Sequence, residues 1–315
     1  MTRSSNTPQI LLTTYRNNVQ DCSYYGSVYI ANTESVYFNT GFKPEHTFFM
    51  RSLAKPLQAS VMCDCNITED FKLKNVELAV MSASHSGSPK HIAILKELMK
   101  RFKIKYSDLE LEAILPLDTR KFKGKPAKLH NNCSGKHIMM ILMCKYLGFK
   151  VSGYTNENHP LQKLIKAKQE ELSGEYNGIL SYDGCSTPLW SISANGIIRA
   201  YFNLFSHEKY SKIIKPAIKY PDIFGGYDRL DSDLIKLGKG NIYSKVGANG
   251  FVIVYNFNKN EILLLKLTQN NNPVRKLIVS DLLNKLGWLN CKTEEYEYNQ
   301  KKVPVAKYCY EINLK

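Results

Sequence analysis

The chain has 315 residues, of which 43% are hydrophobic, and its formal net charge is +15 at pH 7. This much apolar surface excludes an intrinsically disordered chain, and the length suits one large α/β domain or two lobes packed together. The lysines are scattered along the chain as on an ordinary solvated surface, and only residues 96–105 and 119–128 concentrate cations, so we expect no nucleic-acid partner.

Strand patterns open and close the chain. Residues 9–17 and 26–39 predict short strands in a hairpin-like arrangement around the turn-former Asn32. Helical periodicity then takes over in five segments, which are 53–63, 72–81, 90–103, 135–147 and 161–173. Residues 241–269 predict three short strands joined by Gly and Asn turns, and 272–288 predict a helix that follows.

This order of elements predicts an α/β (α+β) fold. A central, mostly antiparallel sheet would be built from the N- and C-terminal parts, with a helical region inserted between them. We predict one domain over residues 1–315. Its possible lobes are a sheet lobe, 1–50 plus 240–315, and a helical lobe, 51–239.

The segment RSLAKP begins the first predicted helix and places Ser52 and Lys55 one turn apart on the same face. A lysine can act as the base for a serine nucleophile only if burial or a nearby cation lowers its pKa. Arg51 supplies such a cation, and Pro56 suits the first helical turn, where its missing N–H costs little. Spacing alone does not distinguish this pair from two surface residues.

A second hydroxyl-rich stretch, SHSGSP, lies where one helix is predicted to stop and Ser88-Pro89 to begin the next. Such a stretch can simply be a turn. As a functional site, it would present Ser84 as a hydroxyl at an exposed, strained corner, available to a substrate.

Two cysteine-containing stretches predict a ligand site. In HNNCSGKH, Cys133, Lys136 and His137 fall at i, i+3 and i+4 across the start of an apolar helix, whose first amides favour a thiolate. In SYDGCSTP, Asp183 and Cys185 share a glycine-centred turn, and Cys185 could supply a second thiolate to a metal. A capped helix with a buried cysteine, followed by an ordinary turn, is the structural alternative.

Two lysines lie in predicted C-terminal strands, Lys245 in SKVG and Lys266 in ILLLKLT. An unpaired buried ammonium is costly, so Lys266 should have a partner or a lowered pKa. A lysine that reaches solvent from an edge strand is the alternative.

The N-terminal apolar run is too short for the core of a signal peptide, and no later window is apolar enough to cross a membrane. We therefore expect a soluble cytoplasmic protein with no membrane partner. Its eight cysteines should then be mostly free thiols.

Six motifs in one order carry a family resemblance: RSLAKPLQA, SHSG, HNNCSGKH, DGCSTP, KVGANG and LLLKL. Together they resemble the rhizobial-type (class 3) L-asparaginases, the asparaginase II family. The resemblance implies a fold similar to that of serine β-lactamases and penicillin-binding proteins, which share the S-x-x-K motif and have a K-x-G strand. The glycine-rich threonine motif of the asparaginases with paired threonine nucleophiles is missing.

The resemblance also implies roles for individual residues. The catalytic residues would form two Ser-Lys tandems, Ser52 with Lys55 and Ser84 with Lys266. The ligands of a Zn²⁺ site would be Cys133, Lys136 and Cys185. The substrate-binding residues would be Arg51, His137 and Asp183.

The implied activity is hydrolysis of L-asparagine to L-aspartate and ammonia by a homodimer. A β-lactamase- or peptidase-like serine hydrolase is the alternative, followed by a non-enzymatic zinc- or polyanion-binding protein. Three residues depart from the family pattern: Ser88 where an acidic residue is usual, Ser186 where glycine is common, and Asn249 where glutamate is common. They remove no nucleophile, base or ligand, but they would alter substrate fit or rate.

Overall fold

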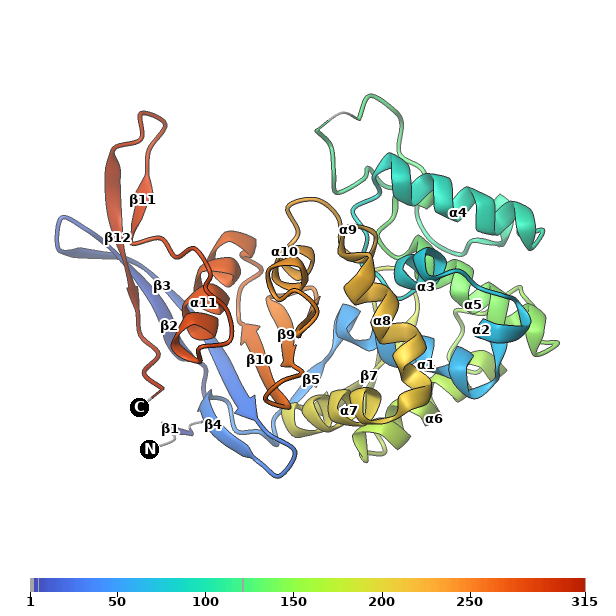
Figure 1. The fold of residues 1–315 in the computed structure, drawn as a ribbon, viewed down its shortest axis with the longest axis horizontal. Coiled ribbons are helices and arrows are strands. Elements are labelled where there is room, and N and C mark those ends of the chain that lie inside the picture. The colour runs from blue at the N-terminus through green and yellow to red at the C-terminus, as the bar shows by residue number, and fades with distance from the viewer. Residues whose placement is uncertain (1–2, 5, 121, 315) are drawn as a thin grey trace. The chain divides into compact units, whose positions relative to one another are not determined.

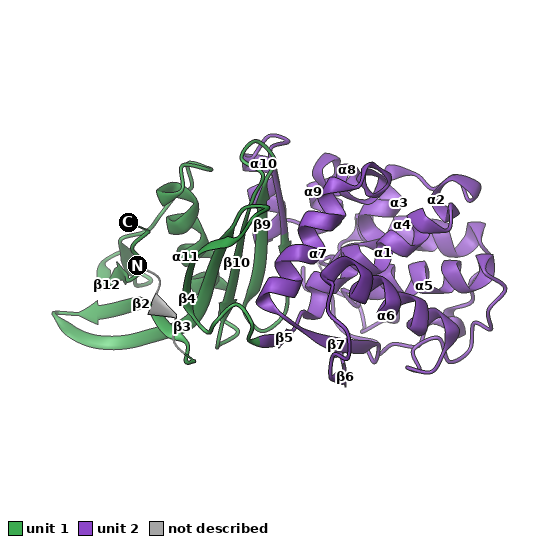
Figure 2. Ribbon diagram, turned by 90° about the horizontal axis from the view of Figure 1, so that it is seen from below, with its two compact units in different colours: residues 1–46, 245–315 green, residues 47–244 purple. Residues whose placement is uncertain are grey.

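The computed structural model describes residues 3–4, 6–120 and 122–314 (Figure 1). The chain divides into two compact units, coloured separately in Figure 2. The first unit comprises residues 1–46 and 245–315, and the second comprises residues 47–244. The chain thus leaves the first unit once and returns to it after a continuous insertion.

A largely antiparallel sheet forms the first unit, with its strands in the order β11-β12-β2-β3-β10-β9. These strands are β2 (Gln9–Arg16), β3 (Val19–Ala31), β9 (Phe251–Asn256), β10 (Glu261–Leu267), β11 (Tyr296–Tyr298) and β12 (Pro304–Tyr310). β4 (Val36–Gly41) also pairs with β3, and β1 (Arg3–Ser4) pairs with β4. Because β3 pairs with β10, the sheet joins the two ends of the chain, as predicted.

Local sequence explains the ends of these elements. The side chain of Asn32 accepts hydrogen bonds from the amides of Glu34 and Ser35, both at 2.9 Å, and so closes the turn between β3 and β4. The last long helix, α11 (Asn272–Lys285), begins after Asn271, whose side chain caps the Val274 amide. The predicted run of strands followed by a helix is confirmed here.

Helices make up most of the second unit (Figure 1). They are α1 (Ala54–Asp64), α2 (Ile67–Asp70), α3 (Asn75–Met81), α4 (Pro89–Arg101), α5 (Ser134–Tyr146), α6 (Pro160–Ser173), α7 (Ala194–Ser206), α8 (Ser211–Lys219), α9 (Pro221–Phe224) and α10 (Leu230–Leu237). A small antiparallel sheet accompanies them, with the strands β5 (Thr47–Phe49), β7 (Pro188–Ser193) and β6 (Leu180–Tyr182) in that order. β8 (Ile242–Val246) then carries the chain into the first unit.

The prediction of a helical insertion is therefore right for the five predicted helices, but it omits α2, the helices α7 to α10 and this small sheet. Its strands β5 and β6 are three residues long, which is too short for an alternating pattern to stand out in the sequence. The α+β class, with an antiparallel sheet from both ends and a mainly helical insertion, is confirmed.

The centre of the second unit holds two helices that are buried on nearly all sides, α1 and α5. The start of α5 packs very tightly on the end of α3: a Cβ added at Gly135 would lie 2.2 Å from the carbonyl oxygen of Val80. Glycine is thus required for this contact. The contact brings the residues around Cys133 next to the loop that follows α3.

Two smaller observations concern the helices and the cysteines. Within the described ranges, no helix combines the length and the apolar character needed to cross a membrane. All eight cysteines are free, as predicted.

Candidate active site

Lys55, at the start of α1, is buried among polar groups of the second unit. Its side chain is 1% exposed, and its Nζ donates to the carbonyl oxygens of Ala83 and Asn132 at 2.7 and 3.0 Å and to Ser84 Oγ at 3.1 Å. These three contacts match the three donors of a lysine ammonium. All its hydrogen-bond acceptors among the described residues are uncharged oxygens.

Ser84 belongs to the loop between α3 and α4, and it is buried, with 2% exposure. The prediction of an exposed corner is therefore wrong. The loop packs on the segment before α5, and a Cβ added at Gly87, whose φ is +72°, would lie 2.8 Å from the carbonyl oxygen of His130. Glycine allows this close approach, which fixes the Ser84 hydroxyl beside Lys55.

His85 ties the same loop to α5, since its Nε2 lies 3.0 Å from Ser134 Oγ. Its ring is completely buried, and burial, followed by the charges of His91 and Lys55, holds its pKa well below the ordinary value. His85 is therefore a neutral residue that connects the Ser84 loop to α5.

Ser52 lies one turn before Lys55, in a short 3₁₀ turn over Arg51–Leu53. It is buried, but no hydrogen bond joins its Oγ to Lys55 Nζ among the residues described. The hydroxyl in contact with Lys55 is thus Ser84. The assignment of Ser52 and Lys55 to one tandem stays a prediction.

Arg51 has the left-handed φ of +53°, which non-glycine residues seldom adopt. Its Nε donates to Asp183 Oδ1 at 2.6 Å, and this partly buried ion pair links the start of α1 to the turn after β6. Backbone strain of this kind is typical of functional sites. Two of the predicted substrate-binding residues are therefore in contact with each other.

Cys133 and Cys185 lie close together and share a hydrogen bond. That bond, together with the Lys136 charge, holds the pKa of Cys185 well below its ordinary value against the effect of burial. The same bond and burial raise the pKa of Cys133. The pair is therefore best described as a Cys185 thiolate that accepts a hydrogen bond from the Cys133 thiol.

Lys136 completes this cluster. Its Nζ lies 2.9 Å from Cys185 Sγ and 2.6 Å from Thr187 Oγ1, and the side chain is fully buried. Burial lowers its pKa, but the Cys185 and Cys133 sulfurs raise it, and the net shift is upward. Lys136 is thus the counter-ion of the thiolate.

The donor set fits a zinc ion. The two sulfur atoms and a carboxylate oxygen of Asp183 all lie within 4.8 Å of one another. Thiolate and carboxylate are zinc ligands, and the thiolate form is already favoured at Cys185. Lys136 would have to lose its proton to join them. Asp183, predicted to bind substrate, is thus a candidate ligand as well.

His137 lies next to this cluster but outside its group of candidate ligands. Its Nδ1 is 2.5 Å from the Tyr154 hydroxyl, and its buried Nε2 makes no hydrogen bond of normal geometry within the described part of the chain. Burial lowers its pKa, while the nearby Cys185 thiolate raises it, and the net shift is downward. The ring is therefore neutral.

Lys266 lies in β10 of the first unit. Its Nζ donates to the Leu267 carbonyl and lies 5.3 Å from the centre of the Phe251 ring. Burial lowers its pKa, which confirms the expectation for this lysine. Lys245, in β8, is fully buried and donates to the Val246 carbonyl at 2.8 Å. The pairing of Ser84 with Lys266 joins residues of different units and stays a prediction.

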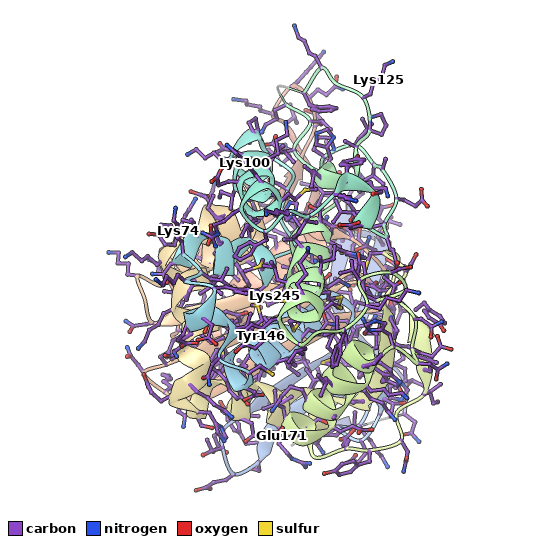
Figure 3. The ribbon with its side chains drawn as sticks, turned by 90° about the vertical axis from the view of Figure 1, so that its right-hand side faces the viewer. Lys74, Lys100, Lys125, Tyr146, Glu171 and Lys245 are labelled. Carbon is purple, nitrogen blue, oxygen red and sulfur yellow. The ribbon has the colours of Figure 1, made fainter. Side chains whose placement is uncertain are left out.

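The basic loop 119–128 has fewer free cations than its sequence indicates. Arg120 forms a two-point contact with Asp118 and stacks 3.8 Å from the centre of the Tyr227 ring. Lys125 is exposed on this loop (Figure 3), and Lys121 lies outside the described residues.

Three residues of the site were not predicted. Asn132 and Thr187 lie inside the motifs that contain Cys133 and Cys185. Their position beside these cysteines is the only sequence signal that could have indicated them. Tyr154 lies in an irregular stretch after α5, and no pattern in the sequence distinguishes it from the other tyrosines.

Comparison with known structures gives weak similarities of fold. The chain is similar to a penicillin binding protein from Bacillus halodurans, with 13% identity and a TM-score of 0.44 over 82% of this chain and 95% of that one. It is also similar to a β-lactamase from Mycobacterium bovis (12%, TM-score 0.43, 82% and 94%) and to a class A β-lactamase from Mycobacterium abscessus (10%, 0.43, 83% and 94%). No curated protein sequence matches the chain.

The decisive comparison is with a protein family. The sequence model of L-asparaginase II matches residues 12–309, which include every residue of the site described above. With nearly its whole length matched, the chain belongs to the L-asparaginase II family, a family of asparaginase-type amidohydrolases.

Proposed function

We propose that this protein hydrolyses L-asparagine to L-aspartate and ammonia through an acyl-enzyme formed on a serine. The observation that carries the proposal is the contact of 3.1 Å between Lys55 Nζ and Ser84 Oγ, both of them buried, where every acceptor of the lysine within the described residues is uncharged. A serine hydroxyl hydrogen-bonded to an amine is the arrangement that a Ser-Lys nucleophile requires.

The geometry also indicates how Lys55 would work as a base. A neutral amine has two N–H donors and one lone pair. The Ala83 and Asn132 carbonyls can only accept, so they would take the two donors and leave the lone pair directed at Ser84. Lys55 can then remove the Ser84 proton directly. A proton from Ser52 would reach Lys55 only after a side-chain movement or through Ser84.

The rest of the site supports substrate positioning. The α-carboxylate of an amino acid would suit Arg51, and its ammonium would suit Asp183, which are already paired in this structure. Zn²⁺ held by Cys133, Lys136 and Cys185, with Asp183 beside them, would supply a Lewis acid that anchors and orients the substrate. His137 offers a neutral ring at the edge of this cluster.

Ammonia release from L-asparagine by single variants tests the proposal. Ser84→Ala should lower kcat about 10²- to 10⁴-fold, the range expected for loss of a proton-transfer group. The kcat of Ser52→Ala should fall by as much if Ser52 carries the acyl group. Ser60→Ala is the matched control, because Ser60 is a buried serine of α1 whose hydroxyl donates to the Leu57 carbonyl and lies outside the site. Wild-type rates in both active-site variants would contradict the serine mechanism.

Trapping identifies the acylated serine. A diazoketone analogue of asparagine alkylates the attacking group, and peptide mapping then locates the label on Ser52 or Ser84. L-Glutamine serves as the comparison substrate for specificity. Nitrocefin turnover without ammonia release would instead favour the β-lactamase-like alternative.

Metal content tests the zinc part of the proposal. Protein purified without chelator should contain zinc, and Cys185→Ser should lose it because a thiolate ligand is removed. Cys144→Ser is the control, since Cys144 is a buried cysteine farther along α5. Zinc-free wild-type protein with full activity in Cys133→Ser would contradict this part.

The cytoplasmic location and the homodimer belong to the same proposal. Light scattering coupled to size exclusion at micromolar concentration measures the mass in solution, for which the dimer predicts twice the 36.0 kDa of one chain.

A further inference from the structure

His137 poses a chemical question. Histidine is a common zinc ligand, and this ring lies beside two cysteines and a carboxylate, yet it is outside their group. The ring is completely buried, so water cannot set its protonation pattern. The hydrogen bonds around it decide which nitrogen carries the proton.

Tyr154 supplies the answer, because its hydroxyl has two partners of different kinds. The hydroxyl accepts the backbone N–H of Glu110 at 3.1 Å, and it lies 2.5 Å from Nδ1 of His137. A backbone N–H can only donate, so it cannot receive the phenol proton. Tyr154 is also completely buried, and within the described residues Nδ1 is the only acceptor in reach of that proton.

The phenol therefore donates to Nδ1, and Nδ1 is an acceptor without a proton. In a neutral imidazole the single proton then resides on Nε2. Nε2 is the remaining polar ring atom. It is buried without a hydrogen-bond partner among the described residues, and the Cys185 side chain is close enough to influence the ring. An N–H at that position has no lone pair for a metal, but it can donate to a sulfur or to a substrate oxygen.

We propose that Tyr154 is a positioning residue that holds His137 as the Nε2–H tautomer, which keeps His137 out of the zinc ligand set and makes it a hydrogen-bond donor to the Cys185 sulfur or to bound substrate. This role deepens the proposed amidase function and rests on it. The tautomer itself depends only on the two hydrogen bonds of Tyr154.

Histidine ¹⁵N spectra of ring-labelled protein test the tautomer directly. The native protein should show Nδ1 of His137 as unprotonated and Nε2 as protonated. In Tyr154→Phe the donor to Nδ1 is lost, and the two nitrogens should move toward each other as both tautomers become populated. Tyr243→Phe is the matched control, because Tyr243 is a buried tyrosine whose hydroxyl has no hydrogen-bond partner in the described structure.

A purely structural role of Tyr154 predicts a different outcome. Tyr154→Phe also leaves the Glu110 amide unpaired, so a lower melting temperature is expected in either case. If Tyr154 only stabilises the fold, the His137 signals of the variant stay as in the native protein. That result, or a native spectrum with the proton on Nδ1, would overturn the inference.

Zinc content and kinetics complete the test. His137→Gln should retain zinc, because His137 is not a ligand, whereas Cys185→Ser should lose it. kcat of Tyr154→Phe should fall about tenfold, as expected for a group that acts through another, with KM nearly unchanged. Zinc loss in His137→Gln would overturn the inference. An Nε2–H signal in a protein that releases no ammonia would leave the tautomer intact and reject the proposed function alone.

Discussion

Two buried lysines of the second unit lie in contrasting surroundings. Among the described residues, the hydrogen-bond partners of Lys55 are the uncharged oxygens of Ala83, Asn132 and Ser84. Lys168, on α6, forms ion pairs with Asp64 at 2.6 Å and with Glu171. Burial lowers the pKa of Lys168, but these carboxylates raise it, and the net shift is upward.

The difference lies in the charge of the partners, which are uncharged oxygens for Lys55 and carboxylates for Lys168. A carboxylate partner stabilises the ammonium form and makes its deprotonation costly. Carbonyl and hydroxyl partners stabilise an ammonium less, and they also satisfy a neutral amine. The surroundings of Lys55 thus suit a base, and those of Lys168 suit a structural ion pair that connects α1 to α6.

Exchanging each lysine for methionine gives the largest expected contrast. Lys55→Met should lower kcat about 10²- to 10⁴-fold, because the base is lost. Lys168→Met should leave kcat within about twofold but lower the free energy of unfolding by about 1 to 2 kcal/mol, since the partly exposed Asp64 loses one of its two lysine partners and keeps Lys209. Ammonia assays measure kcat of both variants, and urea denaturation measures their free energies of unfolding. A Lys168 variant that is stable but inactive would break the comparison.

A smaller effect concerns the pH dependence of the Asp64 ion pairs. Burial would raise the pKa of Asp64, but hydrogen bonds from Lys168 and Lys209 lower it, and the net shift is downward. The stability it contributes is therefore present above its unfolded pKa of about 3.9 and is lost as the pH falls through the lower folded value. Asp64→Asn should cost about 1 to 2 kcal/mol at pH 7, and progressively less toward pH 3.

Urea denaturation at several pH values measures the Asp64 effect. Glu208→Gln is the control, because Glu208 pairs with Lys215 on the surface and should cost almost nothing at any pH. A cost for Asp64→Asn that does not change with pH would show that the carboxylate charge contributes little.

The smallest expected effect concerns backbone strain near the site. Ser186 has a φ of +67° and an exposed side chain, in the turn that carries Cys185. Ser186→Gly should raise the free energy of unfolding by about 0.5 to 1 kcal/mol, because glycine adopts this region without a steric cost. Asn249→Gly, at φ +55°, should change less, since asparagine tolerates this region. Thermal unfolding measures both, and a destabilised Ser186→Gly would contradict the strain argument.

Much of the fold could be predicted because its elements carry strong local patterns. Ser88 caps α4 and Pro89 begins it, as their residue types indicate. The Asn32 turn lies where the alternation of apolar and polar residues is interrupted. The residue types of the two stretches indicated a two-thiolate site of Cys133 and Cys185, but the third ligand, Lys136, came only from the family motifs. The contact of Lys55 with Ser84 depends on how the loop after α3 packs, which no local pattern records. The burial of Ser84 was missed for the same reason.

The pairing of β3 with β10 has a consequence for synthesis. Tyr29 lies opposite Leu264, so the N-terminal strands reach their partner only after the entire insertion has been made. At about 5 to 20 residues per second, this leaves β2, β3 and β4 without that partner for on the order of ten seconds or more on the ribosome. During that time the second unit can fold, while an unpaired β3 edge is open to association with other chains. Expression at low temperature or with a chaperone that covers exposed strands should therefore raise the yield of soluble protein more than stabilising the second unit would.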